Sequence, residues 1–178
     1  MSGASCRAWA ARLARGIPAL LLSAGCATPS LSVTEQGFSH RRHDYTIGRA
    51  PAGWERVDVD GAAIAYRRAH NTMSLQSRCG KPVAKPQLMA RHLVIRLPDR
   101  TVVSAGPVPV AGRSGWAQVF DTAEHEVSVR VKTVTLVAQD CTFDWVLAST
   151  ADFEAAESEF DAWRESFQLG LRYQEVGG

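Results

Sequence analysis

An apolar stripe near the C-terminus is the clearest pattern in this sequence. Apolar residues recur there every three or four positions: Phe153, Ala156, Phe160, Trp163 and Phe167. This spacing places them on one face of an α-helix, and the charged side chains of the segment fall off that face. The stripe therefore predicts an amphipathic helix that buries its apolar side against a sheet.

Alternation of apolar and polar residues predicts strands through the middle of the chain. The alternating or extended segments are residues 45–47, 54–59, 62–67, 72–78, 116–122, 127–138 and 141–147. Asp60-Gly61 lies between two of them and predicts a tight hairpin turn. Within residues 127–138 the apolar positions change phase between Val131 and Val134. This change predicts a β-bulge near Lys132–Thr133.

Prolines indicate a helix and an edge strand among these strands. Pro86 suits the first position of a helix, and the helix must end before Pro98. Its apolar side comprises Leu88, Met89 and Leu93, with His92 as a further candidate. Residues 102–110 are extended but contain two prolines, so they form either an edge strand or a loop.

The order of elements predicts an α+β fold. We expect an antiparallel β-sheet meander with a helix inserted mid-chain and a C-terminal amphipathic helix packed on the sheet. Three segments stand in this order: Pro51-x-Gly53-Trp54, Cys141-Thr142-Phe143-Asp144-Trp145-Val146-Leu147 and Phe160-x-x-Trp163-x-x-Ser166-Phe167. Together with the order of elements, they resemble the PsbP/Mog1 fold over about residues 44–170.

That group includes photosystem assembly or oxygen-evolution proteins, Ran-binding proteins and bacterial envelope lipoproteins. The resemblance implies a binding or accessory role without catalysis. It does not imply photosynthesis, because one fold can host unrelated functions.

The first 26 residues have the layout of a secretory signal. Three arginines and no acid precede a short apolar segment that is too short to span a membrane. The segment ends in Leu22-Ser23-Ala24-Gly25-Cys26, which resembles the lipobox of bacterial lipoproteins, with Ser23 where leucine is commonest. The resemblance implies cleavage before Cys26 and attachment of acyl chains to its sulfur and new amine. Ala27 in place of aspartate resembles the sorting pattern for the outer membrane facing the periplasm.

These patterns divide the chain into four parts. We expect a signal peptide over residues 1–25, a lipidated Cys26 with a flexible tether to residue 43, a globular domain over 44–170 and a tail over 171–178. An apolar fraction of 46% and a charged fraction of 21% are typical of globular proteins, and no apolar run is long enough to span a bilayer.

Charge argues against a nucleic-acid partner. Cleavage of residues 1–25 would remove three of the 20 basic residues and none of the 18 acidic ones, which leaves a nearly neutral domain. The remaining basic residues form no stripe of lysine and arginine along the sequence.

Two cysteines remain in the globular part. Cys79 and Cys141 would lie in a compartment that permits disulfides, so we expect a bridge between them. Two separate buried thiols are the alternative. A redox-active pair is not expected, because the spacing is not Cys-x-x-Cys.

Few residues suggest metal or catalytic chemistry. His40, His43 and Asp44 lie at the end of the expected tether, where a solvated linker is the simpler interpretation. A denser polar turn contains Asp121, Glu124, His125 and Glu126. It offers oxygen ligands for a divalent cation, but polar residues at a turn need no such explanation. We predict no metal, no cofactor and no catalytic residue.

Three functional hypotheses follow. The first is a membrane-anchored module that binds an envelope protein partner. The second is a carrier or sensor of a small apolar ligand held between the sheet and the last helix, near Trp145, Phe160 and Trp163. The third, ranked last, is an enzyme.

Basic residues suggest one surface for the first hypothesis. Arg91 and His92, beside Arg96, are candidates for contact with a protein partner or anionic lipid. Arg67, Arg68 and His70 extend this candidate patch. Ordinary surface charge is the alternative.

Overall fold

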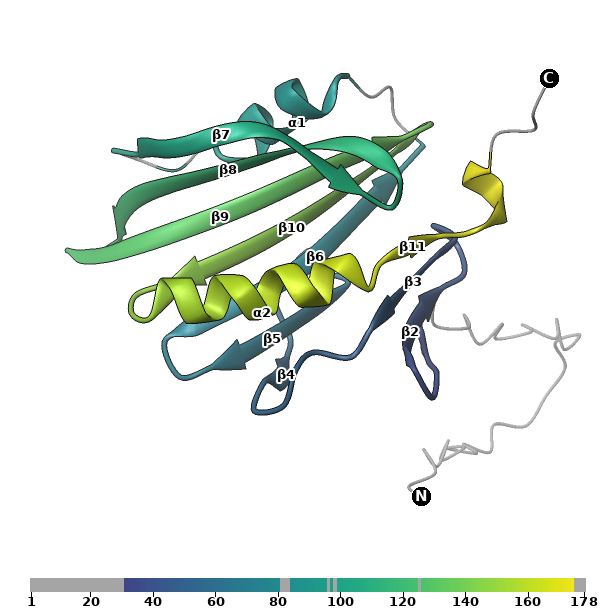
Figure 1. The fold of residues 1–178 in the computed structure, drawn as a ribbon, viewed down its shortest axis with the longest axis horizontal. Helices are drawn as coiled ribbons and strands as arrows, with labels where there is room; N and C mark the ends of the chain where they lie inside the picture. The colour runs from purple at the N-terminus through teal and green to yellow at the C-terminus, as the bar shows by residue number, and fades with distance from the viewer. Residues whose placement is uncertain (1–30, 81–83, 96, 98, 125, 175–178) are drawn as a thin grey trace, which may run out of the picture.

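The computed structural model of the protein describes residues 31–174, except for residues 81–83, 96, 98 and 125. The predicted signal peptide and Cys26 lie outside these residues. The predicted α+β fold is confirmed: two antiparallel sheets and two α-helices form the described part (Figure 1).

A seven-stranded antiparallel sheet forms the body of the molecule. Its strands follow the order β4-β5-β6-β10-β9-β8-β7 across the sheet. In chain order they are β4 (Glu55–Val57), β5 (Ile64–Arg68), β6 (Asn71–Cys79), β7 (Thr101–Val110), β8 (Arg113–Glu124), β9 (Val127–Ala138) and β10 (Cys141–Ser149). The predicted hairpin turn at Asp60-Gly61 joins β4 to β5, and β7 is an edge strand, the first of the two alternatives that its prolines allowed.

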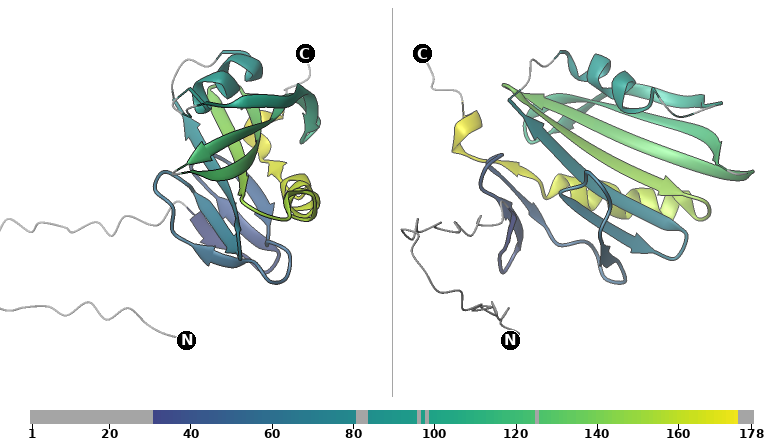
Figure 2. Two further views of the ribbon diagram at one scale, coloured as in Figure 1. Left: turned by 90° about the vertical axis from the view of Figure 1, so that its left-hand side faces the viewer. Right: turned by 180° about the vertical axis from the view of Figure 1, so that it is seen from behind.

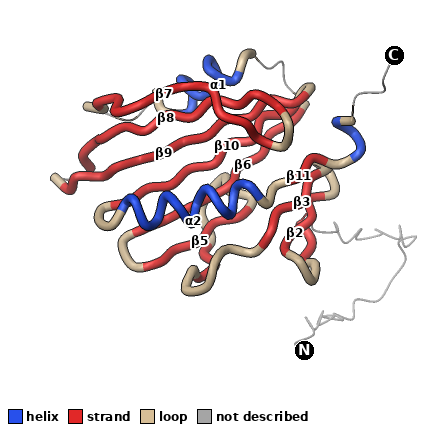
Figure 3. The backbone as a smooth tube through the Cα atoms, viewed as in Figure 1, coloured by secondary structure: helices blue, strands red, loops and turns tan. Residues whose placement is uncertain are grey.

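A smaller sheet lies at one end of this body. Its order is β1-β2-β3-β11, and its strands are β1 (Leu31–Val33), β2 (Gly37–His40), β3 (Tyr45–Gly48) and β11 (Gln168–Leu169). A 3₁₀ turn, η1 (Leu171–Tyr173), follows β11. Figure 3 shows that one loop leads from β3 to the large sheet and another leads from α2 (Phe153–Glu165) to β11.

The small sheet corrects two predicted boundaries. Residues 31–43 are not a flexible tether, because they form β1, β2 and the turn into β3. The C-terminal tail does not begin at residue 171, because Tyr173 is buried in the core. These segments are part of the fold because their few large side chains, such as Phe38 and Tyr173, are buried in the main core.

The two helices cover opposite faces of the large sheet (Figure 2). Helix α1 (Pro86–Leu93) begins at the predicted proline and contacts β8 and β9. Helix α2 (Phe153–Glu165) contacts β10 and buries the predicted stripe, with Phe160 fully enclosed. The main core therefore lies between α2 and the sheet, and a smaller one lies beneath α1.

The β-bulge predicted near Lys132–Thr133 is wrong. Strand β9 pairs without interruption with β8 and β10, and the register shift lies between Val102 and Ser104 in the β7–β8 pair. The apolar phase changes because each end of β9 is covered by a different helix. Val131 belongs to the core under α1, whereas Val134 belongs to the core under α2.

The predicted disulfide is present. Cys79 and Cys141 are opposite residues of β6 and β10, and their sulfurs are bonded across the two strands. The bond links positions 62 residues apart in the sequence, so it closes a loop that contains α1, β7, β8 and β9.

Candidate functional site

A groove runs between helix α1 and the edge of the large sheet. Its volume is about 470 Å³, and its walls come from α1, the loop after it, β7 and β8. The side chains that define it here are Leu88, Arg91, His92, Ile95, Arg100, Val102 and Trp116. We call this hollow the α1 groove.

Packing of α1 determines which of its side chains face the α1 groove. Ala90 is fully buried, and Val94, just after the helix, packs in the small core with Phe120 and Val131. The buried side-chain amide of Gln118 also donates a hydrogen bond to the carbonyl of Ala90 at 3.2 Å. One side of α1 is thereby fixed on β8 and β9, and the other side remains at the surface.

Apolar side chains on this surface are unusually open. Leu88, Ile95 and Val102 are 46%, 64% and 59% exposed, and all three border the α1 groove. Leu88 was expected on the buried side of the helix, and that prediction is wrong, because Ala90 and Val94 take the contact with the sheet. Exposed apolar groups gathered at one hollow are typical of binding surfaces.

Positive charge accompanies these apolar groups. Arg91 and His92, the two residues predicted as candidates for partner contact, are exposed and line the α1 groove. One Arg100 nitrogen donates hydrogen bonds to the carbonyls of Val94 and Leu97, each at 3.1 Å. Arg100 therefore fixes the end of the α1 segment and adds a cation to the groove wall.

The chain segments that contain the two helices differ in charge. The described residues between 84 and 112, which contain α1 and β7, include three basic residues, Lys85, Arg91 and Arg100, and one acid, Asp99. Residues 153–165 of α2 hold five acids and one arginine. The face that carries the α1 groove therefore favours ligands with negative charge.

The predicted basic patch is smaller than expected. Arg68 is on the α2 side of the sheet, where it forms an ion pair with Glu159 at 2.6 Å and lies over the Trp54 ring. Arg67 and His70 belong to β5 and the turn after it, and three strands separate β5 from β8 in the sheet order. They do not line the α1 groove, so the patch reduces to the α1 region.

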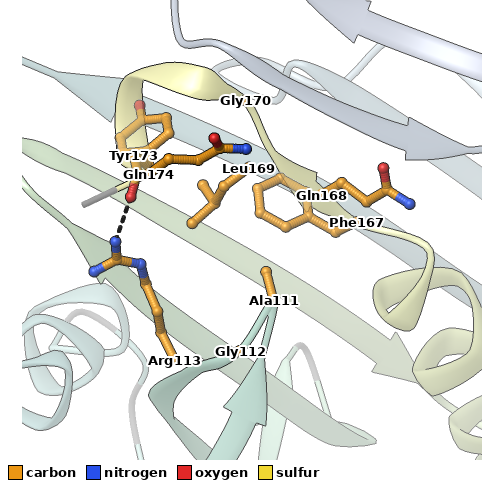
Figure 4. A pocket seen from close by; sticks show the side chains of 9 residues that line it. All are labelled: Ala111, Gly112, Arg113, Phe167, Gln168, Leu169, Gly170, Tyr173 and Gln174. Carbon is orange, nitrogen blue, oxygen red and sulfur yellow. Dashed lines mark hydrogen bonds between the residues drawn. The ribbon is translucent and has the colours of Figure 1, made fainter. Parts of the chain in front are cut away.

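A second hollow lies beside the C-terminal segment (Figure 4). Its volume is about 570 Å³, and it is lined by the β7–β8 turn and by residues 167–170, 173 and 174. The Arg113 guanidinium spans it and donates a hydrogen bond to the Tyr173 carbonyl at 2.5 Å (Figure 4). The one cationic side chain that lines this hollow is thus already hydrogen-bonded to the backbone. The lining residues include no carboxylate, histidine, serine or cysteine that could act as a general base or a nucleophile.

The aromatic residues predicted to hold an apolar ligand are core residues. Trp145, Phe160 and Trp163 are 0%, 0% and 1% exposed. Trp163 contacts the Tyr66 ring edge to face, and its indole donates to the Gly48 carbonyl at 3.1 Å. These side chains belong to the core between α2 and the sheet and line neither hollow described above, so the packing does not favour a ligand held there.

The two histidines of the expected linker are part of the fold. His40 is buried, and its ring stacks on that of His43 with 4.3 Å between centroids. His43 Nδ1 lies 2.7 Å from Ser77 Oγ on the large sheet. Burial lowers the pKa of both imidazoles, and for His43 the neighbouring His40 lowers it further.

The polar turn after β8 holds no complete ligand set among the described residues. Asp121 accepts two hydrogen bonds from Arg130, at 2.7 and 3.0 Å, so its oxygens are already engaged. His125 and the side chain of Glu124 lie outside the described residues. Within the described part of the chain, no three metal-ligating side chains cluster.

One buried carboxylate stands out on the α1 side of the sheet. Asp144 is 1% exposed and accepts hydrogen bonds from Thr135 at 2.7 Å and Arg78 at 2.9 Å. Burial raises the pKa of this carboxyl, and the two donors oppose that shift. Asp144 joins three neighbouring strands and does not line either hollow described above.

Several solved structures have a similar fold, and three of them are PsbP, LpqN and Mog1p. PsbP from the cyanobacterium Synechocystis sp. PCC 6803 matches with a TM-score of 0.55 and 14% identity, over 82% of this chain and 95% of that one. LpqN, involved in cell envelope biogenesis of Mycobacterium tuberculosis, matches with a TM-score of 0.52 and 17% identity, over 72% and 85%. The Ran-binding protein Mog1p of Saccharomyces cerevisiae matches with a TM-score of 0.51 and 9% identity, over 74% and 93%.

These likenesses confirm the predicted PsbP/Mog1-like fold. No family model and no curated protein matches the sequence. In residues 31–174, outside the gaps given above, no helix is long and apolar enough to cross a bilayer.

Proposed function

We propose that this protein is an envelope lipoprotein, anchored through Cys26, that acts as a non-catalytic binding module for a protein partner. The partner contributes an extended or helical segment with aliphatic and acidic side chains, which binds in the α1 groove. The observation that carries this proposal is the gathering of exposed Leu88, Ile95 and Val102 beside Arg91 in one hollow.

The size and chemistry of the α1 groove support a peptide-like ligand. A hollow of about 470 Å³ has room for a few aliphatic side chains. Apolar anchors at the centre of an interface supply most of the binding energy. Cations at the rim, here Arg91 and Arg100, speed association with an acidic partner and orient it.

The known roles of the structural neighbours support a binding role in general terms. LpqN is described as involved in cell envelope biogenesis, and Mog1p as Ran-binding. Neither sequence is close enough to indicate which partner this chain binds, because a shared fold carries no specific function.

The anchor is supported by the sequence and by the disulfide. The basic start, the short apolar segment and small residues before Cys26 agree on a lipoprotein signal. The Cys79–Cys141 bond suits an oxidising compartment such as the periplasm.

Site-specific photo-crosslinking in living cells tests the binding role. A photoreactive amino acid replaces Leu88 in the α1 groove or, as a matched control, Val59 in the β4–β5 turn, which is 41% exposed. We expect one discrete adduct from position 88 and none from position 59. Arg91→Glu should reduce that adduct at least several-fold, because it reverses a groove charge. Equal adducts from both positions, or an adduct that is insensitive to Arg91→Glu, would overturn the assignment.

A further inference from the structure

One end of the small sheet gathers four segments that are distant in sequence. Leu31 pairs with His40, His40 with Tyr45, and Tyr45 with Leu169, which makes a row across all four strands. The start of β1, the turn of residues 41–44 and η1 therefore lie at the same end of this sheet. We call this region the anchor-proximal end.

The chain between Cys26 and the fold is short. Cys26 precedes Leu31, the first residue of β1, by five positions. Five fully extended residues reach at most about 18 Å. A lipidated cysteine at position 26 would consequently hold the anchor-proximal end close to the bilayer, which the expected 18-residue tether would not do.

The exposed side chains of this end suit a lipid surface. Leu171 is 78% exposed, and Arg41 and Arg42 are exposed in the turn between β2 and β3. Among the residues that the structure describes, neither Arg41 nor Arg42 forms an ion pair. A leucine enters the acyl boundary favourably, and nearby guanidinium groups attract anionic headgroups.

The acidic groups of the same end are already engaged. Asp44 accepts a hydrogen bond from the Arg172 backbone N–H at 2.8 Å, and Asp140 forms an ion pair with the Arg172 guanidinium. The Asp140 charge is thereby compensated by Arg172, so Asp44 leaves one negative charge against the two cations Arg41 and Arg42.

We infer that the anchor-proximal end lies on the membrane, with Leu171 at the acyl boundary and Arg41 and Arg42 on anionic lipid headgroups. This inference rests on the lipid anchor proposed above. It also gives the molecule an orientation. The small sheet and α1 lie apart in every view, so a partner can reach the α1 groove while the small sheet contacts lipid (Figures 1 and 2).

Electron paramagnetic resonance on the mature lipidated protein, which begins at Cys26, tests this orientation. A nitroxide is attached to Leu171→Cys or to the matched control Leu88→Cys, in vesicles of phosphatidylethanolamine and phosphatidylglycerol. Mass spectrometry checks that the Cys79–Cys141 bond is intact. We expect the label at position 171 to gain access to oxygen and lose most of its access to a water-soluble nickel complex, and the label at position 88 to stay fully accessible to nickel.

A charge-reversal variant and a flotation assay distinguish the role of the two arginines from that of the lipid anchor. Arg41→Glu combined with Arg42→Glu should return the label at position 171 to the nickel accessibility of the control. If the protein floats with the vesicles but both labels are equally accessible to nickel, the orientation is wrong and the anchor stands. If the protein carries no acyl chain and does not float, the anchor is wrong.

Discussion

The imidazole Nδ1 of His43 lies 2.7 Å from the hydroxyl oxygen of Ser77. His43 precedes β3 of the small sheet, and Ser77 lies in β6 of the large one. The Tyr173 hydroxyl donates a hydrogen bond to the His43 carbonyl at 2.8 Å and lies 3.0 Å from the Cys141 sulfur. The two sheets and the C-terminal segment are therefore joined at one point beside the disulfide.

This junction should make stability depend on pH. Burial lowers the pKa of His40 and His43 below the 6.5 of an exposed histidine, and the nearby Arg42 lowers both pKa values further. At His43, Arg172 also lowers the pKa, whereas Asp140 raises it. Below about pH 6.5 the unfolded chain then binds more protons than the folded one. The free energy of unfolding should therefore fall as the pH is lowered from 7.5 to 5.5.

Urea unfolding at a series of pH values measures this effect. His43→Gln should make the dependence shallower, and Ser77→Ala should cost roughly 1 kcal/mol at neutral pH by removing one hydrogen bond. A wild-type free energy of unfolding that is constant or rises between pH 7.5 and 5.5 would contradict the assignment.

Reduction of the Cys79–Cys141 bond should destabilise the fold strongly. A bond between residues 62 positions apart restricts the unfolded chain. The chain-entropy relation gives roughly 4 kcal/mol for a loop of this length. Denaturant unfolding with and without a reducing agent measures the loss. The double variant Cys79→Ala with Cys141→Ala is the control, and it should not respond to the reductant.

Removal of the Lys132 charge should loosen α2 from the sheet. The buried Lys132 ammonium donates hydrogen bonds to Glu157 at 2.8 Å and Asp161 at 2.7 Å, both on α2. Lys132→Met removes the ion pair of the half-buried Glu157 carboxylate and leaves Asp161 with its longer contact to Arg164 at 3.4 Å, which should cost about 1–3 kcal/mol in the free energy of unfolding. Adding Glu157→Gln and Asp161→Asn should recover part of the loss, and a triple variant no more stable than Lys132→Met would argue against the ion pair as the cause.

Phe160→Ala should behave as a core truncation. Phe160 is fully buried between α2 and the sheet, so its loss should cost about 3–5 kcal/mol. Thermal unfolding measures the change. Binding of a small apolar ligand between α2 and the sheet, measured as a rise in the melting temperature of the wild type, would support the ligand hypothesis instead.

Leu88→Ser should leave the fold intact. Because Leu88 is 46% exposed and Ala90 makes the contact with the sheet, the free energy of unfolding should change by less than about 0.5 kcal/mol. The matched change Ala90→Ser should destabilise more, since that side chain is fully enclosed. Equal costs at the two positions would show that Leu88 is a structural residue rather than part of a binding surface.

Local sequence patterns predicted those helices and strands whose buried face appears as a regular spacing of apolar residues along the chain. The stripe from Phe153 to Phe167 and the alternation in β6 each report one buried face, so helix α2 and its partner strand could be predicted. The disulfide was predicted on a different ground, the two cysteines that remain in a compartment that permits the bond. The phase change in β9 was also visible at Val131 and Val134. Its cause was not, because cover by two helices on opposite faces is a property of the tertiary structure.

The small sheet and the α1 groove escaped prediction for a similar reason. Strands β1 and β2 are only three and four residues long, and their sheet is completed by Gln168–Leu169, more than 120 residues later in the chain. No local pattern indicates such a pairing. Arg91 and His92 were identified from charge alone, but the apolar half of the groove depends on how α1 rests on β8, which brings Val102 and Trp116 beside it.

Metabolic labelling with radioactive palmitate tests the central claim, that the domain is held in the envelope by acyl chains on Cys26. The wild-type protein should carry the label, lose residues 1–25 and fractionate with membranes, and Cys26→Ala should remain an unlabelled, uncleaved precursor. An unlabelled wild-type chain that keeps its first 25 residues and stays free in the cytosol would contradict the account.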